Sequence, residues 1–548
     1  MKAWIVVAAA LSAVPAASAQ DAFDALRRLP VQDGGRIKPL DTFARETARR
    51  VTGARAFGRD SVQGLDPVEW LVAIQAAPDA WRQERIIRVS DAALRAHAGL
   101  PADRERYSFE ELTGNAKLMA AADEARQRQD AGETMTAPED GTLRLYGNLA
   151  LMAAVIGGEA PSVAGGGAEG AWLPVASLTA DVERGKVARA RYDGLLAAYR
   201  AGGAADSSVA ALAFSDSLAP LQAVSDAQRR GLDREVLYNR AKPFRLAWLL
   251  YLVAFLAFLT TQALPSRAVS VAGVAFMTAG FALQTWGFVL RTLIAERAPV
   301  ANMYESIVFA AWGAVLFALV LGRHGARVFA ACATGLAVVF LLLAESVPIF
   351  DAAIDPLAPV LRDNFWLSTH VLTITLGYAA LLLTLALGHV SLALLFLGRG
   401  EARIRTVSGF TYRTMQAGTL LLAAGTLLGG VWASYSWGRF WGWDPKETWA
   451  LIALLVYLAI LHARFAGWIR DLGLAVGSIV GGLSVLMAWY GVNYVLGTGL
   501  HSYGFGAATG TGWVAAYVAV ELALVAVVTW RVRAPRAAVP AASLVHAS

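Results

Sequence analysis

Hydrophobic and charged positions divide the chain into two unequal parts. From about residue 20 to residue 242 charged residues are frequent and apolar residues recur at helical spacing, whereas charges become sparse from residue 243 onward. Apolar residues at helical spacing are typical of surface helices packed on a small core. The pattern therefore predicts a polar, mainly helical domain followed by a membrane domain.

The second part contains apolar runs long enough to cross a bilayer as helices of about 20 residues. Nine such runs lie at roughly 244–263, 268–290, 304–322, 327–345, 369–397, 413–433, 447–465, 471–496 and 511–531. The predicted fold class is an all-α polytopic membrane protein with about nine transmembrane helices, preceded by a mainly α extracytoplasmic domain.

Two stretches of the polar part have the spacing of amphipathic helices, DPVEWLVAIQAAPDAWRQERI (66–86) and SFEELTGNAKLMAAADEARQRQ (108–129). Stretches rich in glycine, alanine and serine at 157–171 and 201–208 predict loops. The turn-rich, charged stretch PVQDGGRIKPLDTFARE (30–46) is interpreted as a docking loop. No repeat, metal cluster or catalytic constellation is evident in the sequence of this part.

The first residues, MKAWIVVAAALSAVPAASAQ, have the composition of a secretory signal peptide. Lys2 precedes a short apolar core, and Ala17-Ser18-Ala19 matches an A-x-A cleavage site. We expect cleavage after Ala19; the alternative is an uncleaved anchor helix. Under either interpretation the next segment lies outside the cytoplasm. The predicted parts are a signal peptide (1–19), a periplasmic domain (20–242), a transmembrane domain (243–533) and a cytoplasmic tail (534–548).

The distribution of arginine tests this orientation. With residues 20–242 outside, every loop predicted to be cytoplasmic contains arginine, and so does the tail. These arginines are Arg267, Arg323, Arg327, Arg399, Arg403, Arg405, Arg413, Arg464, Arg470, Arg531, Arg533 and Arg536. The predicted outside loops (291–303, 346–368, 434–446 and 497–510) carry fewer, and the last has no Lys or Arg. The positive-inside rule thus agrees with the signal peptide and predicts a multi-pass protein of the bacterial inner membrane.

Composition narrows the function classes. Hydrophobic residues make up 56% of the 548 residues and charged residues 16%, below the roughly 25% of soluble proteins. The net charge of +6 comes from basic residues in short loops between apolar runs, which indicates a lipid bilayer as partner and no nucleic acid. Cys332 is the one cysteine, so an internal disulfide or C-x-x-C pair is excluded and any thiol chemistry must belong to a partner.

Two histidines and a tryptophan-rich loop fall on one predicted face of the membrane. His370 opens the fifth run, His501 lies in the loop after the eighth, and WGRFWGWDPKETW (437–449) joins the sixth and seventh. Neutral imidazoles bind iron, and indoles can line a flat macrocycle, so the combination indicates a haem site. The alternatives are interfacial histidines and an aromatic belt at the headgroups.

The loop itself has a structural as well as a ligand-binding interpretation. Asp444 suits a helix N-cap, followed by Pro445 at the first position and Glu447 at the third, as in a capping box. Trp437 and Trp441 would share one face if this part were helical. With Trp443 and Trp449 they are expected to form an apolar wall, and Arg439 to meet a propionate or a lipid phosphate.

Two further histidines lie inside apolar runs, toward the cytoplasmic end. His389 is 19 residues beyond His370, roughly 28 Å, and His462 is 15 residues beyond Glu447, roughly 22 Å, at 1.5 Å per residue. An ionisable residue within a span is a candidate functional residue. The alternatives are a helix–helix hydrogen bond for His389 and snorkelling for His462. Glu521, in the ninth run, is expected to pair with a neighbouring histidine or arginine or to be neutral.

At this point the sequence resembles a known family. The stretch WGRFWGWDPKETWALIALLVYLAILHAR resembles the WWD signature of haem-handling proteins, most closely the CcsA/ResC family of system II cytochrome c biogenesis. RAPVANMYESIVF (297–309), FWLSTHVLTITLGYAALLL (365–383) and GVNYVLGTGLHSYGF (491–505) resemble its flanking motifs, in the family's order. The resemblance covers residues from about 235 to 530.

The resemblance implies roles for particular residues. His370 and His501 match the outer histidines that ligate haem iron, and the segment from Trp437 through Trp441, Arg439, Trp443 and Asp444 matches the haem-binding loop. His462 matches the transmembrane histidine that ligates haem transiently during its transfer. We hypothesise in addition that His389 and His462 ligate haem together, although His389 is not part of the family pattern.

The resemblance also implies haem b as bound ligand and substrate, and a set of partners. These are a CcsB/ResB-type membrane protein, apocytochrome c with its C-x-x-C-H cysteines, and a thioredoxin-like thiol reductant. This chain shows no partner-like half, and its domain at 20–242 is extra to the minimal family.

The function implied is export of haem and its covalent attachment to apocytochrome c, with this chain as the haem-presenting component of a holocytochrome c synthase. No acid–base dyad or nucleophile is evident, so catalysis is expected to come from positioning. One alternative is a haem exporter or chaperone without synthase activity of its own. A transporter for another solute would instead show inverted repeats and midplane sites.

Overall fold

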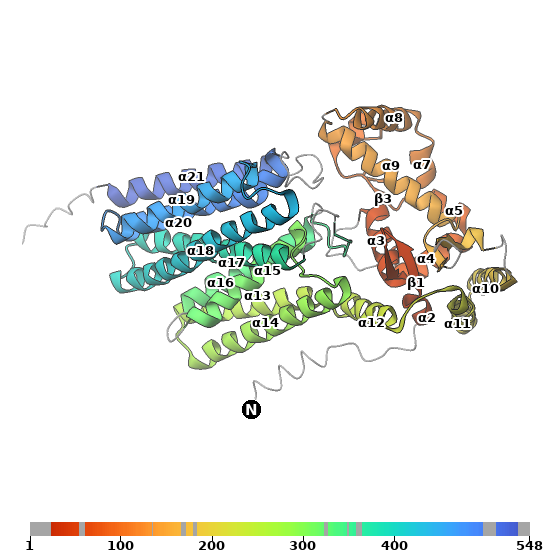
Figure 1. The fold of residues 1–548 in the computed structure, drawn as a ribbon, viewed down its shortest axis with the longest axis horizontal. Helices are drawn as coiled ribbons and strands as arrows, with labels where there is room; N and C mark the ends of the chain where they lie inside the picture. Colours follow the sequence, from red (N-terminus) through yellow and green to blue (C-terminus); the bar gives the residue numbers. More distant parts are fainter. Residues whose placement is uncertain are drawn as a thin grey trace, which may run out of the picture.

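The structure is a computed structural model of the chain. It describes residues 23–53, 61–133, 135–165, 171–178, 183–322, 327–347, 350–357, 364–496 and 511–534. The proposed signal peptide and most of the tail lie outside the described residues. Figure 1 shows a bundle of long helices, α13 to α21, with a smaller N-terminal domain at one end, joined through α12 (Asp226–Ala241).

The N-terminal domain is mainly helical. Its helices are α2 (Asp24–Arg27), α3 (Leu40–Thr52), α4 (Pro67–Ala76), α5 (Pro78–Gln83), α6 (Ala92–His97), α7 (Phe109–Thr113), α8 (Ala116–Asp130), α9 (Ala137–Ile156), α10 (Glu183–Arg200) and α11 (Ala204–Leu218). Strands β1 (Pro30–Asp33), β2 (Arg36–Pro39), β5 (Ser162–Gly165) and β6 (Trp172–Pro174) form an antiparallel sheet in the order β2-β1-β5-β6, and β3 (Ile87–Arg88) pairs with β4 (Arg106–Tyr107). One apolar core, with Trp70 fully buried, joins these elements.

Several local expectations for this domain need correction. The helix expected at 66–86 is two helices, because Pro78 starts α5 directly after α4. The helix expected at 108–129 also divides, since Gly114 ends α7 and the Asn115 side chain caps α8. Residues 204–208, expected in a loop, open α11.

The described part of the chain contains nine helices long and apolar enough to cross a membrane, which confirms the predicted fold class. They are α13 (Pro243–Ala263), α14 (Arg267–Ala295), α15 (Met303–Leu321), α16 (Arg327–Ser346), α17 (Asn364–Phe396), α18 (Glu401–Trp437), α19 (Pro445–Phe465), α20 (Asp471–Leu486) with its π-helical continuation η4 (Met487–Leu496), and α21 (Thr511–Arg533). Helix α12 runs into α13 through Lys242, which has a left-handed φ of 45°.

Helix α17 packs against α15, α16, α18, α20 and α21 and is the centre of the bundle. Small residues bring its backbone close to its neighbours. A Cβ atom at Gly418 of α18 would lie 2.8 Å from the Leu381 side chain, and one at Gly425 would lie 2.7 Å from Ile374. Glycine at such positions allows two membrane helices to approach closely, and here it fixes how α17 lies against α18.

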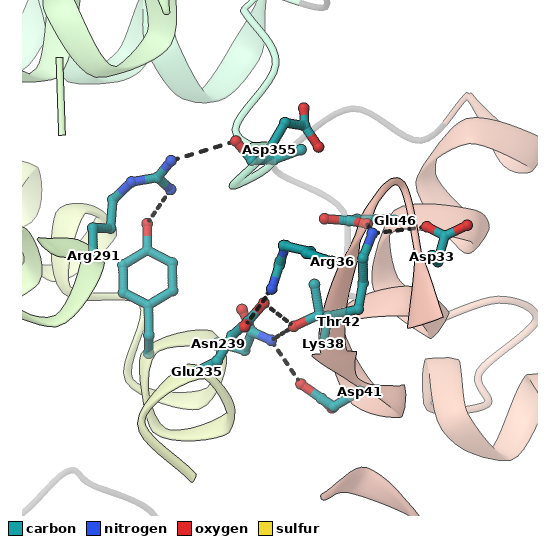
Figure 2. A network of polar contacts seen from close by, with 12 residues as sticks. Asp33, Arg36, Lys38, Asp41, Thr42, Glu46, Glu235, Asn239, Arg291 and Asp355 are labelled. Atoms are coloured by element: carbon teal, nitrogen blue, oxygen red, sulfur yellow. Dashed lines mark hydrogen bonds and ion pairs between the residues drawn. The ribbon is translucent and has the colours of Figure 1, made fainter. Parts of the chain in front are cut away.

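A polar network fastens the N-terminal domain to the bundle (Figure 2). The stretch 30–46 forms the β1–β2 hairpin and the start of α3, and the hairpin lies against α12. Arg36 of the hairpin donates from both terminal nitrogens to Glu235 of α12, at 2.7 and 2.8 Å. Thr42 donates to the same carboxylate at 2.8 Å. The structure thus places the expected docking loop at the junction of the two parts.

Asp41 extends this network. It accepts hydrogen bonds from Arg27, Arg45 and Asn239, the last of these from α12. Burial alone would raise the pKa of Asp41, but the hydrogen bonds and charges of its partners outweigh burial and lower that pKa below its ordinary value. Because the pKa is lowered on folding, the contribution of Asp41 to stability is complete at neutral pH and is lost as the pH falls into the acid range.

The hairpin turn also reaches the segment before α17. A Cβ atom at Gly35 would lie 3.7 Å from Pro356, within ordinary contact distance. The N-terminal domain therefore packs on α12 and lies close to the 350–357 segment.

We predict that Arg36→Ala destabilises the protein, because Glu235, 3% exposed, is left buried without its cationic partner. Removing one partner of a buried ion pair costs about 3 kcal/mol. The melting temperature of the detergent-solubilised protein, followed by circular dichroism, is expected to fall by about 5–10 °C.

Arg85→Ala is the matched control, since Arg85 forms an exposed pair with Glu111 and its side chain is 57% exposed. An exposed pair contributes about 0–1 kcal/mol, so a shift of at most about 2–4 °C is expected. Equal shifts in the two variants would contradict the docking role of Arg36.

Candidate functional site

A large cavity lies between helices α15, α17, α18 and α19 and the π-helical segment η4. Its volume is about 170 Å³. Its wall is mostly apolar and aromatic and includes His370, Tyr378, Trp441 and Trp489. An apolar cavity with a few convergent polar groups is the usual form of a ligand site.

His370 lies on α17 and has a defined orientation. Its Nδ1 is 2.7 Å from the carbonyl oxygen of Gly425 on α18. A carbonyl can only accept, so Nδ1 carries the proton and the ring's lone pair is on Nε2, the arrangement typical of metal-binding histidines. The ring also stacks nearly parallel to Trp432, with centroids 6.5 Å apart and 5° between the planes.

Gly429 makes room for this imidazole. A Cβ atom there would lie 2.6 Å from Cε1 of His370, closer than real Cβ contacts. The position of the ring therefore depends on glycine at 429.

The tryptophans of the loop 437–449 lie in different environments. Trp437 ends α18, and Gly438 follows with a left-handed φ of 70°, so Trp437 and Trp441 do not share a helical face as expected. Trp437 instead packs edge-on against Trp432, with centroids 4.7 Å apart. Trp441 lines the cavity, whereas Trp443, with a φ of 58°, is 70% exposed.

The second half of the loop starts α19 as the sequence predicts. Asp444 is the N-cap, Pro445 the first helical residue, and Asp444 and Glu447 form a capping box. The Glu447 carboxylate also accepts from Gly442 N at 2.7 Å and from Arg439 Nη1 at 3.1 Å. Capping thus holds the loop in place beside the cavity.

Arg439 has a different partner from the one expected. Its guanidinium pairs with Glu447 and lies over the ring of Trp437, 5.6 Å from the centroid. The structure gives its charge a carboxylate from the protein, where the sequence suggested an anionic group of a ligand or lipid.

Another wall of the cavity is built on the segment 297–309. Glu305 is 1% exposed and accepts from Arg291 at 2.7 Å, from Arg297 at 2.8 Å and from Ala301 N at 2.8 Å. The two arginines also donate to backbone carbonyls of the 350–357 segment, Arg291 to Ala352 and Arg297 to Asp355. Arg297 itself lines the cavity. One buried carboxylate therefore ties this wall to the segment in front of α17.

Sequence reasoning missed part of the site. Trp432, Trp489, Lys446 and Asn493 line the cavity but were not singled out. Lys446 Nζ lies 3.0 Å from Asn493 Oδ1, which joins the start of α19 to η4. The available signal was Asn493, a polar residue inside an apolar run, since such residues are often functional.

The transmembrane histidines have separate environments. His389 Nδ1 lies 2.9 Å from the Leu385 carbonyl, and its Nε2 lies 2.8 Å from Glu521 of α21. Glu521, for which the sequence left a histidine or an arginine open as partner, thus pairs with His389. His462 is exposed on α19, and its Nδ1 lies 2.7 Å from the Leu458 carbonyl. The position of His501 lies outside the described residues.

Comparison with known proteins identifies the family. The profile of the family described as "Cytochrome C assembly protein" matches residues 300–501. Protein NrfI of Wolinella succinogenes is 34% identical over 288 residues, which cover 50% of this chain but only 32% of NrfI. A solved structure titled Cytochrome c Heme Lyase CcmF has a TM-score of 0.39 at 17% identity, covering 55% of this chain and 51% of CcmF, too distant to support an argument.

Cytochrome c biogenesis protein CcsA of Synechococcus sp. (strain CC9902) is 38% identical over 243 residues, which cover 38% of this chain and 78% of that protein. CcsA of Parasynechococcus marenigrum is 37% identical, with the same coverage. These matches extend over more than two thirds of the relatives' length, and the matched family segment contains the histidine, the tryptophan loop and most of the cavity wall. The chain belongs to the CcsA family.

Proposed function

We propose that this protein acts in cytochrome c biogenesis by binding haem in the cavity, with His370 as an iron ligand. The observation that carries the proposal is the His370 ring, held by the Gly425 carbonyl through Nδ1, in the wall of a large aromatic cavity. An imidazole fixed through one nitrogen is oriented to bind iron through the other. The relatives' names, which concern cytochrome c biogenesis, support the same role.

The cavity suits a flat macrocycle. Haem b has a large apolar ring, two vinyl groups and two propionates, so it needs aromatic walls, an axial ligand and cationic or amide partners at one edge. Trp441 and Trp489 supply aromatic wall, and Arg297 and Lys446 supply cations. We propose His501 as the second iron ligand. It follows η4 in the sequence, and η4 forms part of the cavity wall.

The chemistry proposed is thioether formation by positioning. Each cysteine S–H of the apocytochrome adds across one vinyl group, with the sulfur bonding to one carbon and the hydrogen to the other, so the addition itself is redox-neutral. A haem held with its vinyl edge toward the cavity mouth turns this addition into a local reaction. The protein's own residues hold and orient the haem, while free cysteine thiols depend on a thioredoxin-like reductant.

We propose that the protein works in the bacterial inner membrane with its N-terminal domain in the periplasm. The cavity lies at the ends of α15, α17, α18 and α19 that the arginine distribution places outside the cytoplasm. The N-terminal domain is attached at the same end of the bundle through Arg36 and Glu235. Apocytochrome c, which receives its haem outside the cytoplasm, would thus meet the cavity there.

His462 supports a role for a second membrane protein. Its side chain is exposed on α19, a helix that is mostly unburied in this chain. We propose that the second imidazole for a haem held by His462 comes from another chain, such as a CcsB/ResB-type partner. His389 would have to release Glu521 before it could ligate iron with His462.

The second candidate function, haem export or chaperoning without synthase activity, uses the same ligands. Co-expression with an apocytochrome and a CcsB/ResB-type partner separates the two. Covalent haem on the apocytochrome that depends on this chain supports the synthase role. Haem binding without covalent attachment supports export alone.

We predict that His370→Gly lowers the haem content of the purified protein by about tenfold or more, because an axial ligand is lost. Added imidazole is expected to restore the absorption spectrum of ligated haem by filling the space of the missing ring. The measurement is the visible absorption spectrum with and without imidazole. His97→Ala, in α6 of the N-terminal domain, is the control and should leave the spectrum unchanged. A spectrum of His370→Gly like that of the wild type would reject the ligand assignment.

We also predict that Gly429→Ala weakens haem binding by about 10–100-fold without removing any ligand, since the new methyl group displaces the His370 ring. Gly409→Ala is the matched control on the same helix, because a Cβ atom there meets nothing within 4 Å. The measurement is haem titration of both purified variants. Equal affinities would show that the ring position seen here does not govern binding.

A further inference from the structure

Lys446 is the second residue of α19 and lines the cavity, as Trp441 and Trp489 do. Its Nζ has one polar contact, with the amide oxygen of Asn493 at 3.0 Å. An ammonium group has three N–H donors, and this contact uses one of them. Within the described parts of the chain, the ion pairs of this region do not include Lys446.

The other cations at or near the cavity wall already have carboxylate partners. Arg297, which lines the cavity, shares Glu305 with Arg291, and Arg439, in the neighbouring loop, pairs with Glu447. Glu447, the residue after Lys446, is the carboxylate that pairs with Arg439. Asp444, two residues before Lys446, accepts through Oδ1 from the backbone N–H of Lys446 at 2.9 Å, as a helix cap does.

The helix N-terminus itself is not an anion site here. Pro445 has no N–H, the Asp444 side chain accepts from Lys446 N and from Glu447 N, and Thr448 N donates to the Asp444 carbonyl. Among the described residues, the Lys446 ammonium lines the cavity and has N–H donors beyond the one that Asn493 accepts.

From this arrangement we infer that Lys446, held by Asn493, is the carboxylate subsite of the cavity and binds one propionate of the haem. An ammonium in an apolar wall is costly unless an anion accompanies it, and a propionate carboxylate supplies both the charge and the hydrogen-bond acceptor. The inference rests on the proposed function and makes it more specific. With one propionate at Lys446, the propionate edge of the haem lies against α19 and η4, and the vinyl groups lie on the remaining edge.

The test compares haem with haem dimethyl ester, in which both propionates are neutral, by titration of the purified full-length protein. The wild type is expected to bind haem about tenfold more tightly than the ester. Lys446→Gln keeps N–H donors on a side chain one bond shorter but loses the charge. It should bind haem about tenfold less tightly, bind the ester as before, and so lose the preference. Lys446→Arg should retain it.

Two further measurements separate a ligand contact from a structural role. The spectrum of haem bound to Lys446→Gln should show unchanged ligation by His370, because the subsite does not touch iron. Lys117→Gln, in α8 of the N-terminal domain, controls for the loss of a positive charge and should change neither affinity.

Each outcome bears on the inference. Equal weakening of haem and ester in Lys446→Gln would assign the lysine to holding α19 against η4 and would overturn it. Unchanged affinity for both would overturn it as well. A wild-type protein that binds haem and its ester equally would reject the carboxylate subsite but leave haem binding intact. Failure of the wild type to bind either would overturn the proposed function and this inference together.

Discussion

The close approach of α17 to α18 is the constraint on which the cavity depends. It requires glycine where the helices meet, since side chains at Gly418 and Gly425 would collide with α17, and one at Gly429 would collide with His370. Only at this separation can the His370 imidazole reach the Gly425 carbonyl. That hydrogen bond fixes the tautomer and the direction of the ring, and the aromatic wall is arranged around it. Backbone packing between α17 and α18 thus sets the position of the His370 ring in the cavity wall.

Buried charge links this centre to the rest of the molecule. Glu305 holds two arginines, which in turn hold the carbonyls of the segment before α17. The β1–β2 hairpin of the N-terminal domain lies close to the same segment and pairs with Glu235 of α12. Ion pairs of this kind contribute little net stability but are costly to break one partner at a time, so they specify one arrangement. The N-terminal domain is therefore fixed relative to the end of the bundle that contains the cavity.

The sequence predicted what depends on local pattern. The nine spans follow from runs of apolar residues, and the start of α19 follows from Asp444, Pro445 and Glu447. The motifs also identified His370 and Trp441 as candidate site residues, and both line the cavity. What the sequence could not supply was pairing between distant segments. Arg439 pairs with Glu447, which the sequence did not predict. Trp437 packs against Trp432 and does not share a helical face with Trp441, because Gly438, with a left-handed φ, ends the helix after Trp437.

The same limit explains the residues that were missed and the partners left undecided. Trp489, Asn493 and Lys446 come together only because η4 packs beside α19, a contact that no spacing within one segment reveals. His389 and Glu521 are 132 residues apart in sequence. Their pairing depends on the packing of α21 near α17, which spacing along the chain does not reveal. Burial of a polar group within a span indicated that a partner exists, but its identity required the tertiary structure.

Binding of haem in the cavity, with His370 as an iron ligand, is tested most directly by an electron cryo-microscopy map of the detergent-solubilised protein loaded with haem. We expect density for the macrocycle inside the cavity, with iron at bonding distance from Nε2 of His370 and one propionate toward α19. A macrocycle outside the cavity, or inside it with iron away from His370, would contradict haem binding through His370.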